Sequence, residues 1–206
     1  MKAPRMTLAA VALTSVAALP SLASAQQTPW SGRIALTEMH PADESDPFGP
    51  YAADAIHINN KMFPEIDVYY GFTKSIVAEL VLTYPQQQEV TLAGRYIGTF
   101  RQLPPTLLAQ YHFLPGRAFD PYVGAGVNFT WITDVDLLNH AVDLKHSSWG
   151  AAGQVGVDMN LDKQWFLNLD IKYMNISTDL LDTSGNRLTT VTVNPLLYSL
   201  GVGYHF

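Results

Sequence analysis

Charged side chains recur at alternate positions within segments that are otherwise rich in apolar residues. Glu65 and Asp67 are two residues apart, as are Asp170 and Lys172. Residues two positions apart in a β-strand share a face, and charges on a confined inner face need partners. We therefore expect an interior plug of ion pairs and hydrogen bonds; the alternative is that each charge only stabilises the interior. The predicted members are Arg33, Glu65, Asp67, Glu79, His112, Asp158, Asp170 and Lys172.

Serine and histidine side chains in the same segments could support nucleophilic catalysis if they met. A serine nucleophile needs a base within hydrogen-bond reach, and His112 and His205 are the candidate bases. The candidate nucleophiles are Ser75, Ser148 and Ser199. Most of these hydroxyls would face the interior, away from a lipid substrate, so we expect the protein not to be an enzyme.

A group of histidines and aspartates between residues 134 and 146 is a further candidate for chemistry. Its members are Asp134, Asp136, His140, Asp143 and His146. Their spacing matches no standard set of metal ligands, and a polar segment of this kind is typical of a solvated loop. We therefore expect neither a metal site nor another cofactor.

Apolar side chains take over the inner face toward the other end of the predicted strands. Lipid contact does not account for apolar groups on an inner face. Flexible methionine beside aliphatic and aromatic neighbours makes a pocket that tolerates small apolar ligands; the alternative is packing that simply fills the interior. The predicted substrate-binding residues are Met39, Phe63, Leu108, Met174, Ile176 and Leu197.

Prolines interrupt two neighbouring predicted strands at about the height of this pocket. Pro104 and Pro105 face Tyr84 and Pro85. Because proline has no backbone N–H, the hydrogen bonding between these strands is expected to stop here. Two interpretations remain open, namely a lateral portal that releases cargo into the membrane and a bulge at which a loop begins.

The elements that must position these residues are predicted from alternating apolar and polar positions. In the segment Thr192 to Phe206, the face that begins at Leu196 is wholly apolar with aromatic rings, and the other face is mostly small or polar, as in a strand of a membrane β-barrel. Seven further segments share the pattern and bring the total to eight strands. These segments are Trp30 to His40, Met62 to Phe72, Ser75 to Tyr84, Gln102 to Phe113, Pro121 to Thr133, Ser148 to Leu161 and Gln164 to Ser177.

The connections between these segments alternate between short and long. Bacterial outer-membrane barrels combine short periplasmic turns with long extracellular loops. We therefore predict an all-β fold, an eight-stranded antiparallel transmembrane β-barrel with both termini in the periplasm. The alternative is a soluble lipocalin-like barrel with its apolar face inward. Glycines on the polar faces, such as Gly124 and Gly203, favour the cramped interior of a small membrane barrel.

The N-terminus and the composition agree with this assignment. Lys2 and Arg5 precede an apolar run and a small-residue site at residues 23–25, so residues 1–25 are predicted to be a signal peptide and residues 26–206 the barrel domain. The chain has 18 acidic and 12 basic residues and a net charge of −6, which argues against nucleic acid as a partner. The absence of cysteine rules out disulfides.

Four segments together resemble the outer membrane protein W (OmpW) family. They are residues 103–106 (LPPT), 121–128 (PYVGAGVN), 148–158 (SWGAAGQVGVD) and 201–206 (GVGYHF). The resemblance runs from about Trp30 to Phe206 and weakens in the predicted loops. It implies an eight-stranded barrel that conducts small hydrophobic compounds across the outer membrane of a Gram-negative bacterium.

The expected partners follow from this resemblance. They are outer-membrane lipid, small hydrophobic solutes and the outer-membrane insertion machinery, which would recognise the closing strand ending in Phe206. The alternative function is a structural or receptor barrel, without specific transport, whose loops bind phage, colicin or host surfaces. Uptake assays discriminate between the two.

Overall fold

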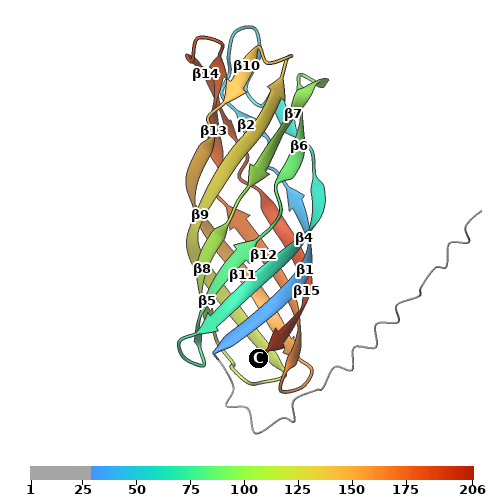
Figure 1. Cartoon of the computed structure of the whole chain (residues 1–206), viewed down its shortest axis with the longest axis vertical. Coiled ribbons are helices and arrows are strands. Elements are labelled where there is room, and N and C mark those ends of the chain that lie inside the picture. Colours follow the sequence, from blue (N-terminus) through green and yellow to red (C-terminus); the bar gives the residue numbers. More distant parts are fainter. Residues whose placement is uncertain (1–28) are drawn as a thin grey trace, which may run out of the picture.

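Fifteen strands between Trp30 and His205 form one continuous antiparallel sheet, and eight of them close it into a barrel (Figure 1). The computed structural model describes residues 29–206, so the predicted signal peptide and the predicted start of the barrel domain at residue 26 lie outside the described residues. The barrel strands are β1 (Trp30–His40), β4 (Lys61–Gly71), β5 (Ile76–Leu82), β8 (Thr106–His112), β9 (Phe119–Leu137), β11 (Ser147–Asn160), β12 (Trp165–Met174) and β15 (Leu196–His205).

Pairing between the first and last strands closes the barrel. The β1–β15 register runs from Ser31 opposite His205 to His40 opposite Leu196. The other neighbours follow in the order β1-β4-β5-β8-β9-β11-β12-β15. The predicted eight-stranded antiparallel barrel is therefore confirmed. Within residues 29–206, no helical segment has the length and apolar character needed to span a membrane.

The two ends of the barrel differ. At one end, here called the turn end, short connections join β4 to β5, β8 to β9 and β11 to β12, and the C-terminus lies there too (Figure 1). One of these turns is held by Asp162, whose Oδ1 accepts hydrogen bonds from the backbone N–H groups of Trp165 and Gln164, both at 2.7 Å. These bonds lower the pKa of the exposed Asp162 carboxyl.

The opposite end, here called the loop end, contains more strand than expected. Its connections are long, as predicted, but much of their length is β-structure (Figure 1). The additional strands are β2 (Glu44–Ser45), β3 (Ile56–Ile58), β6 (Gln86–Leu92), β7 (Arg95–Leu103), β10 (Val142–Leu144), β13 (Ser177–Asp182) and β14 (Arg187–Thr192). A tilted membrane strand needs about 9–11 residues, so the 19 residues of β9 carry the wall well beyond a bilayer.

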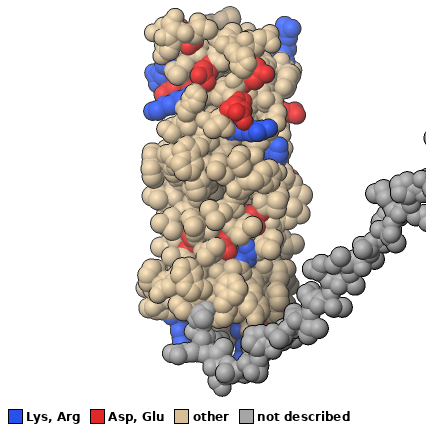
Figure 2. All heavy atoms as spheres, viewed as in Figure 1, with Lys and Arg blue, Asp and Glu red and all other residues tan. Residues whose placement is uncertain are grey.

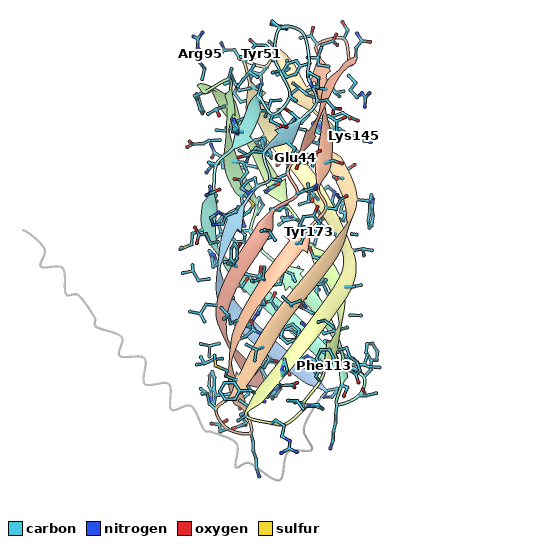
Figure 3. The ribbon with its side chains drawn as sticks, turned by 180° about the vertical axis from the view of Figure 1, so that it is seen from behind. Glu44, Tyr51, Arg95, Phe113, Lys145 and Tyr173 are labelled. Carbon is cyan, nitrogen blue, oxygen red and sulfur yellow. The ribbon has the colours of Figure 1, made fainter. Side chains whose placement is uncertain are left out.

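The outer wall between the two ends is apolar. Ile34 is 67% exposed and Leu200 is 60% exposed, whereas Arg33 beside Ile34 is 2% exposed. Charged side chains on the face in Figure 2 gather near the ends, and few lie between them. Exposed aromatic rings sit toward the borders of this band, as Phe113 near the turn end and Tyr173 higher on the wall illustrate (Figure 3). The charges inside and apolar groups outside rule out the lipocalin-like alternative.

Small residues on the inner face make room for large neighbours. A Cβ atom at Gly201 would lie 2.9 Å from the Cδ atom of Arg33, and one at Gly203 would lie 2.0 Å from Cζ of Phe166. Glycine at these positions therefore lets the Arg33 and Phe166 side chains lie across the narrow interior.

Candidate passage through the barrel interior

The inward side chains change character from the turn end to the loop end. Along β12 they are Phe166 at the turn end and then Asn168, Asp170, Lys172 and Met174 in succession, all buried. On β4, in the same direction, the inward residues change from Asp67 and Glu65 to Phe63. Arg33 and Lys172 each contact both Glu65 of β4 and Asp170 of β12, whereas Phe63 and Met174 both belong to the buried apolar cluster, so the interior is divided into a charged layer and an apolar layer.

Six charged side chains form the charged layer, here called the ion-pair cluster. They are Arg33, Glu65, Asp67, Glu79, Asp170 and Lys172. The Nε atom of Arg33 lies 2.6 Å from Oδ2 of Asp67, its Nη2 lies 2.9 Å from Oε1 of Glu65, and its Nη1 also contacts Asp170. Lys172 ties the same layer together, with Nζ 2.8 Å from Glu65 Oε1 and 2.9 Å from Asp170 Oδ1.

Glu79 joins this cluster from β5, the strand that pairs with β4. Its Oε1 accepts a hydrogen bond from the Tyr69 hydroxyl at 3.1 Å, and its Oε2 accepts one from Nε2 of Gln110 at 2.9 Å. The Nη2 atom of Arg33 is 3.5 Å away. The cluster thus places four carboxylates around two cations, with every one of the six side chains at most 1% exposed.

The other two predicted plug residues, His112 and Asp158, lie nearer the turn end. His112 Nδ1 is 3.1 Å from Asp120 Oδ2 and 4.0 Å from Asp158 Oδ2. Both residues line an open vestibule of about 470 Å³. They connect to the ion-pair cluster through Asn168, whose Nδ2 donates to Asp158 and whose Oδ1 accepts from Arg33.

The candidate serine nucleophiles are not placed against a base. His205 Nδ1 lies 2.8 Å from the Ser31 hydroxyl, and the His112 ring contacts Asp120 and Gln110. In the described part of the chain, neither imidazole is hydrogen-bonded to the hydroxyl of Ser75, Ser148 or Ser199. None of the three candidate serines is therefore paired with a histidine, and the serine that His205 does contact is Ser31.

All six predicted pocket residues are buried in one continuous apolar cluster. Each is at most 3% exposed, and the cluster continues into the loop end through residues that the alternation of the sequence had left in predicted loops. These additional members include Ile56, Ile58, Val90, Phe100, Leu137, Leu180 and Val191. Their signal was present in the alternation of Gln86–Leu92, where Val90 and Leu92 are buried and their neighbours point outward or half-outward.

Side chains fill most of this apolar cluster. A cavity of about 20 Å³ remains near the loop end, lined by additional members such as Ile58, Phe100 and Val191 and by none of the six predicted residues. This volume is about that of a single water site. A solute would therefore have to displace side chains, which the unbranched Met39 and Met174 side chains permit because methionine has three flexible torsions.

The strand ladder is interrupted beside the apolar cluster. The β5–β8 pairing ends at Val81 opposite Thr106, and the β6–β7 pairing begins only at Gln86 opposite Gln102. The residues between these pairs do not oppose one another in the ladder. They are Leu82–Pro85 on one side and Leu103–Pro105 on the other, and they include Tyr84, Pro85, Pro104 and Pro105. This unpaired stretch between the two segments is here called the seam.

Strand β9 holds the proline segment on the side away from this seam, because β7 and β8 both pair with β9. The backbone N–H of Phe129 donates to the Pro105 carbonyl at 3.1 Å, and Nδ2 of Asn128 lies 3.3 Å from the Pro104 carbonyl. A second break, which the sequence pattern did not predict, lies on the other side of β5. The β4–β5 pairing stops at Ile66 opposite Leu82, although β4 continues to Lys61 and contains Pro64.

Comparisons with known proteins agree with the fold. The model of the OmpW family matches residues 33–206. An uncharacterized outer-membrane protein, y4mB of Sinorhizobium fredii, is 34% identical over 96% of this chain and 90% of its own length. The dibenzothiophene metabolism operon protein PahQ of Pseudomonas aeruginosa is 28% identical over 88% of this chain and 90% of its own length. The crystal structure of outer membrane protein OprG from P. aeruginosa superimposes with a TM-score of 0.75, at 28% identity, over 87% of this chain and 97% of OprG.

Proposed function

Because this chain belongs to the OmpW family of outer-membrane proteins, we propose that it is a channel for small hydrophobic molecules. The observation that carries this proposal is the buried apolar cluster within the barrel at the loop end, next to an interrupted strand ladder. The name of the relative PahQ refers to the metabolism of dibenzothiophene, an apolar compound, which supports the same class of solute. The family match also confirms the resemblance noted in the four sequence segments.

The proposed orientation in the Gram-negative outer membrane places the turn end in the periplasm. Short periplasmic turns and long extracellular segments are usual in such barrels, and the extended wall at the loop end fits the extracellular side. Both termini of the barrel are then periplasmic. The closing strand β15 and Phe206 would be the part that the outer-membrane insertion machinery recognises.

The proposed route runs from the loop end into the apolar cluster and then sideways through the seam. The ion-pair cluster opposes descent, because an apolar solute would have to separate buried charges that partner one another. Unpaired backbone groups facing lipid are costly unless something covers them. A solute beside Pro104 and Pro105 would provide that cover, as a lateral portal at this height requires.

Uptake in a porin-poor Gram-negative strain tests the channel. Cells expressing the chain are expected to take up nonane faster than cells with an empty vector, with no gain for a monosaccharide. Heat-modifiable gel migration verifies that the barrel has folded in the membrane. Folded protein with no gain in nonane uptake would contradict the proposal and favour the structural or receptor alternative.

Restoring backbone donors at the seam tests the portal. In the double variant Pro104→Ala/Pro105→Ala, each hydrogen bond formed favours a closed ladder by roughly 0.5–1.5 kcal/mol. The variant is expected to be at least as stable as the parent toward thermal unfolding in detergent, yet slower in nonane uptake. Pro121→Ala, which changes an exposed proline of β9 at the turn end, is the matched control. Normal uptake despite amide-exchange protection at both new alanines would show that the seam is not the exit.

A further inference from the structure

Three buried glutamines project inward from the β6–β7 hairpin. Gln86 and Gln88 are on β6 and Gln102 is on β7, and they are 1%, 0% and 2% exposed. Gln86 lies directly opposite Gln102 in the register, and Gln88 lies opposite Phe100. The three side chains, here called the glutamine trio, therefore share one face and one level of the wall.

The glutamine trio has unused hydrogen-bonding capacity. Among the described residues, neither the amide nitrogen nor the amide oxygen of Gln86 and Gln88 has a partner, and Oε1 of Gln102 has none. The Nε2 atom of Gln102 meets only the weak acceptor Sδ of Met39, at 3.6 Å. A buried amide without partners is costly, and other inward positions of the same hairpin, such as Val90 and Phe100, are apolar. Packing alone would favour apolar residues at all three positions.

The position of the trio indicates what it could bind. Toward the loop end, the inward residues of β6 change from Gln86 and Gln88 to Val90 and Leu92, all buried. Gln86 directly follows Pro85, so the trio also borders the seam. A molecule at this level would have amides around one end and the apolar cluster around the other.

We propose that the glutamine trio binds the uncharged polar group of an amphipathic solute, such as an alcohol, whose apolar part occupies the apolar cluster. The amides offer both donors and acceptors, which a hydroxyl group can use together. The trio itself contains no ionised side chain, so a charged head would be desolvated there without a counterion. This proposal rests on the proposed function and narrows its solutes to small apolar molecules that carry an uncharged oxygen function.

Side-chain amide NMR of the folded protein in lipid nanodiscs tests binding separately from transport. The probes are 1-octanol and nonane, which have the same number of heavy atoms, and octanoate as the charged analogue. In protein labelled with ¹⁵N-glutamine, 1-octanol is expected to shift the amide resonances of the trio, and nonane and octanoate are not. Gln87, which points outward from the same strand, reports solute dissolved in the lipid. The proposal is overturned if the amide resonances of the trio do not shift at saturating 1-octanol, or if the Gln87 resonance shifts as strongly as those of the trio.

A triple variant, Gln86→Leu/Gln88→Leu/Gln102→Leu, tests the energetic role of the amides. Titrations are followed on the methyl signal of Met39, which contacts Gln102. Loss of the amide hydrogen bonds is expected to weaken 1-octanol binding about tenfold and to leave nonane binding unchanged or tighter. Gln87→Leu is the matched control. If the triple variant does not fold, the single variant Gln88→Leu is used instead, and its affinity for 1-octanol is expected to fall about threefold.

The two proposals fail in different ways. If 1-octanol and nonane binding fall together in a folded variant, the amides are structural and the trio has no role in recognition. If 1-octanol shifts the trio but cells expressing the parent take up neither nonane nor 1-octanol, the binding site stands and the proposed transport function is wrong.

Discussion

Replacing Arg33 by methionine is expected to destabilise the barrel by about 3–5 kcal/mol. The substitution removes the cation that contacts Asp67, Glu65, Asp170 and Glu79 in a layer where these side chains are fully buried. Lys172 would then be the single cation among four carboxylates, and water would be drawn into the layer. Urea unfolding in lipid vesicles measures the loss of stability, and a rise in ion conductance is expected in the same variant.

The matched control is an exposed ion pair at the loop end. Arg101 Nη1 lies 3.2 Å from Asp134 Oδ2, but the two side chains are 50% and 65% exposed. Solvent screens such a pair, so Arg101→Met is expected to cost no more than about 1 kcal/mol. If Arg33→Met costs no more than Arg101→Met, the ion-pair cluster does not stabilise the barrel.

The variant Leu108→Asp is expected to abolish most of the nonane uptake. Leu108 is 2% exposed within the apolar cluster, where an unpaired carboxylate costs several kcal/mol unless it takes up a proton or draws in water. Either response places a polar group in the proposed route. Leu108→Met keeps the position apolar and of similar volume, and it is expected to transport normally.

The Leu108→Asp protein must reach the outer membrane for this comparison. Heat-modifiable migration and equal surface abundance separate loss of the route from loss of the barrel. Unchanged nonane uptake by a folded Leu108→Asp variant would mean that solutes do not pass through the apolar cluster.

The strands and their faces could be predicted because the period of two is strict in the membrane-crossing part. Ile34 and Leu36 face outward and Arg33 faces inward, as the alternation indicated. The position of the β5–β8 interruption could also be predicted, because Pro85, Pro104 and Pro105 lack the backbone N–H that strand pairing needs. The break between β4 and β5 was missed because β4 continues past the point where its pairing with β5 stops. That point is set by the register between the two strands.

The particular partners inside the barrel could not be read from the sequence. Arg33 meets Asp170, which is 137 residues away, because closure of the sheet brings β1 and β12 to the same level. The strand-rich loop end was missed because segments such as residues 85–101 contain many polar residues and suggested solvated loops. The glutamine trio was missed for the same reason, since glutamine is usually exposed and its burial in this barrel follows from the register of β6 and β7.

The central claim is that apolar molecules pass through the apolar cluster at the loop end, whereas ions do not pass the ion-pair cluster. The direct test is a planar bilayer with lipopolysaccharide on one side and phospholipid on the other, containing the purified protein. Transfer of naphthalene from the lipopolysaccharide side, followed by its fluorescence, and ionic current are recorded together. If the charged layer blocks ions as proposed, naphthalene transfer is faster than in a bilayer without the protein and the ionic current stays near that of the protein-free bilayer, because the ion pairs of this layer are fully buried. A large, stable current without faster naphthalene transfer would contradict the central claim.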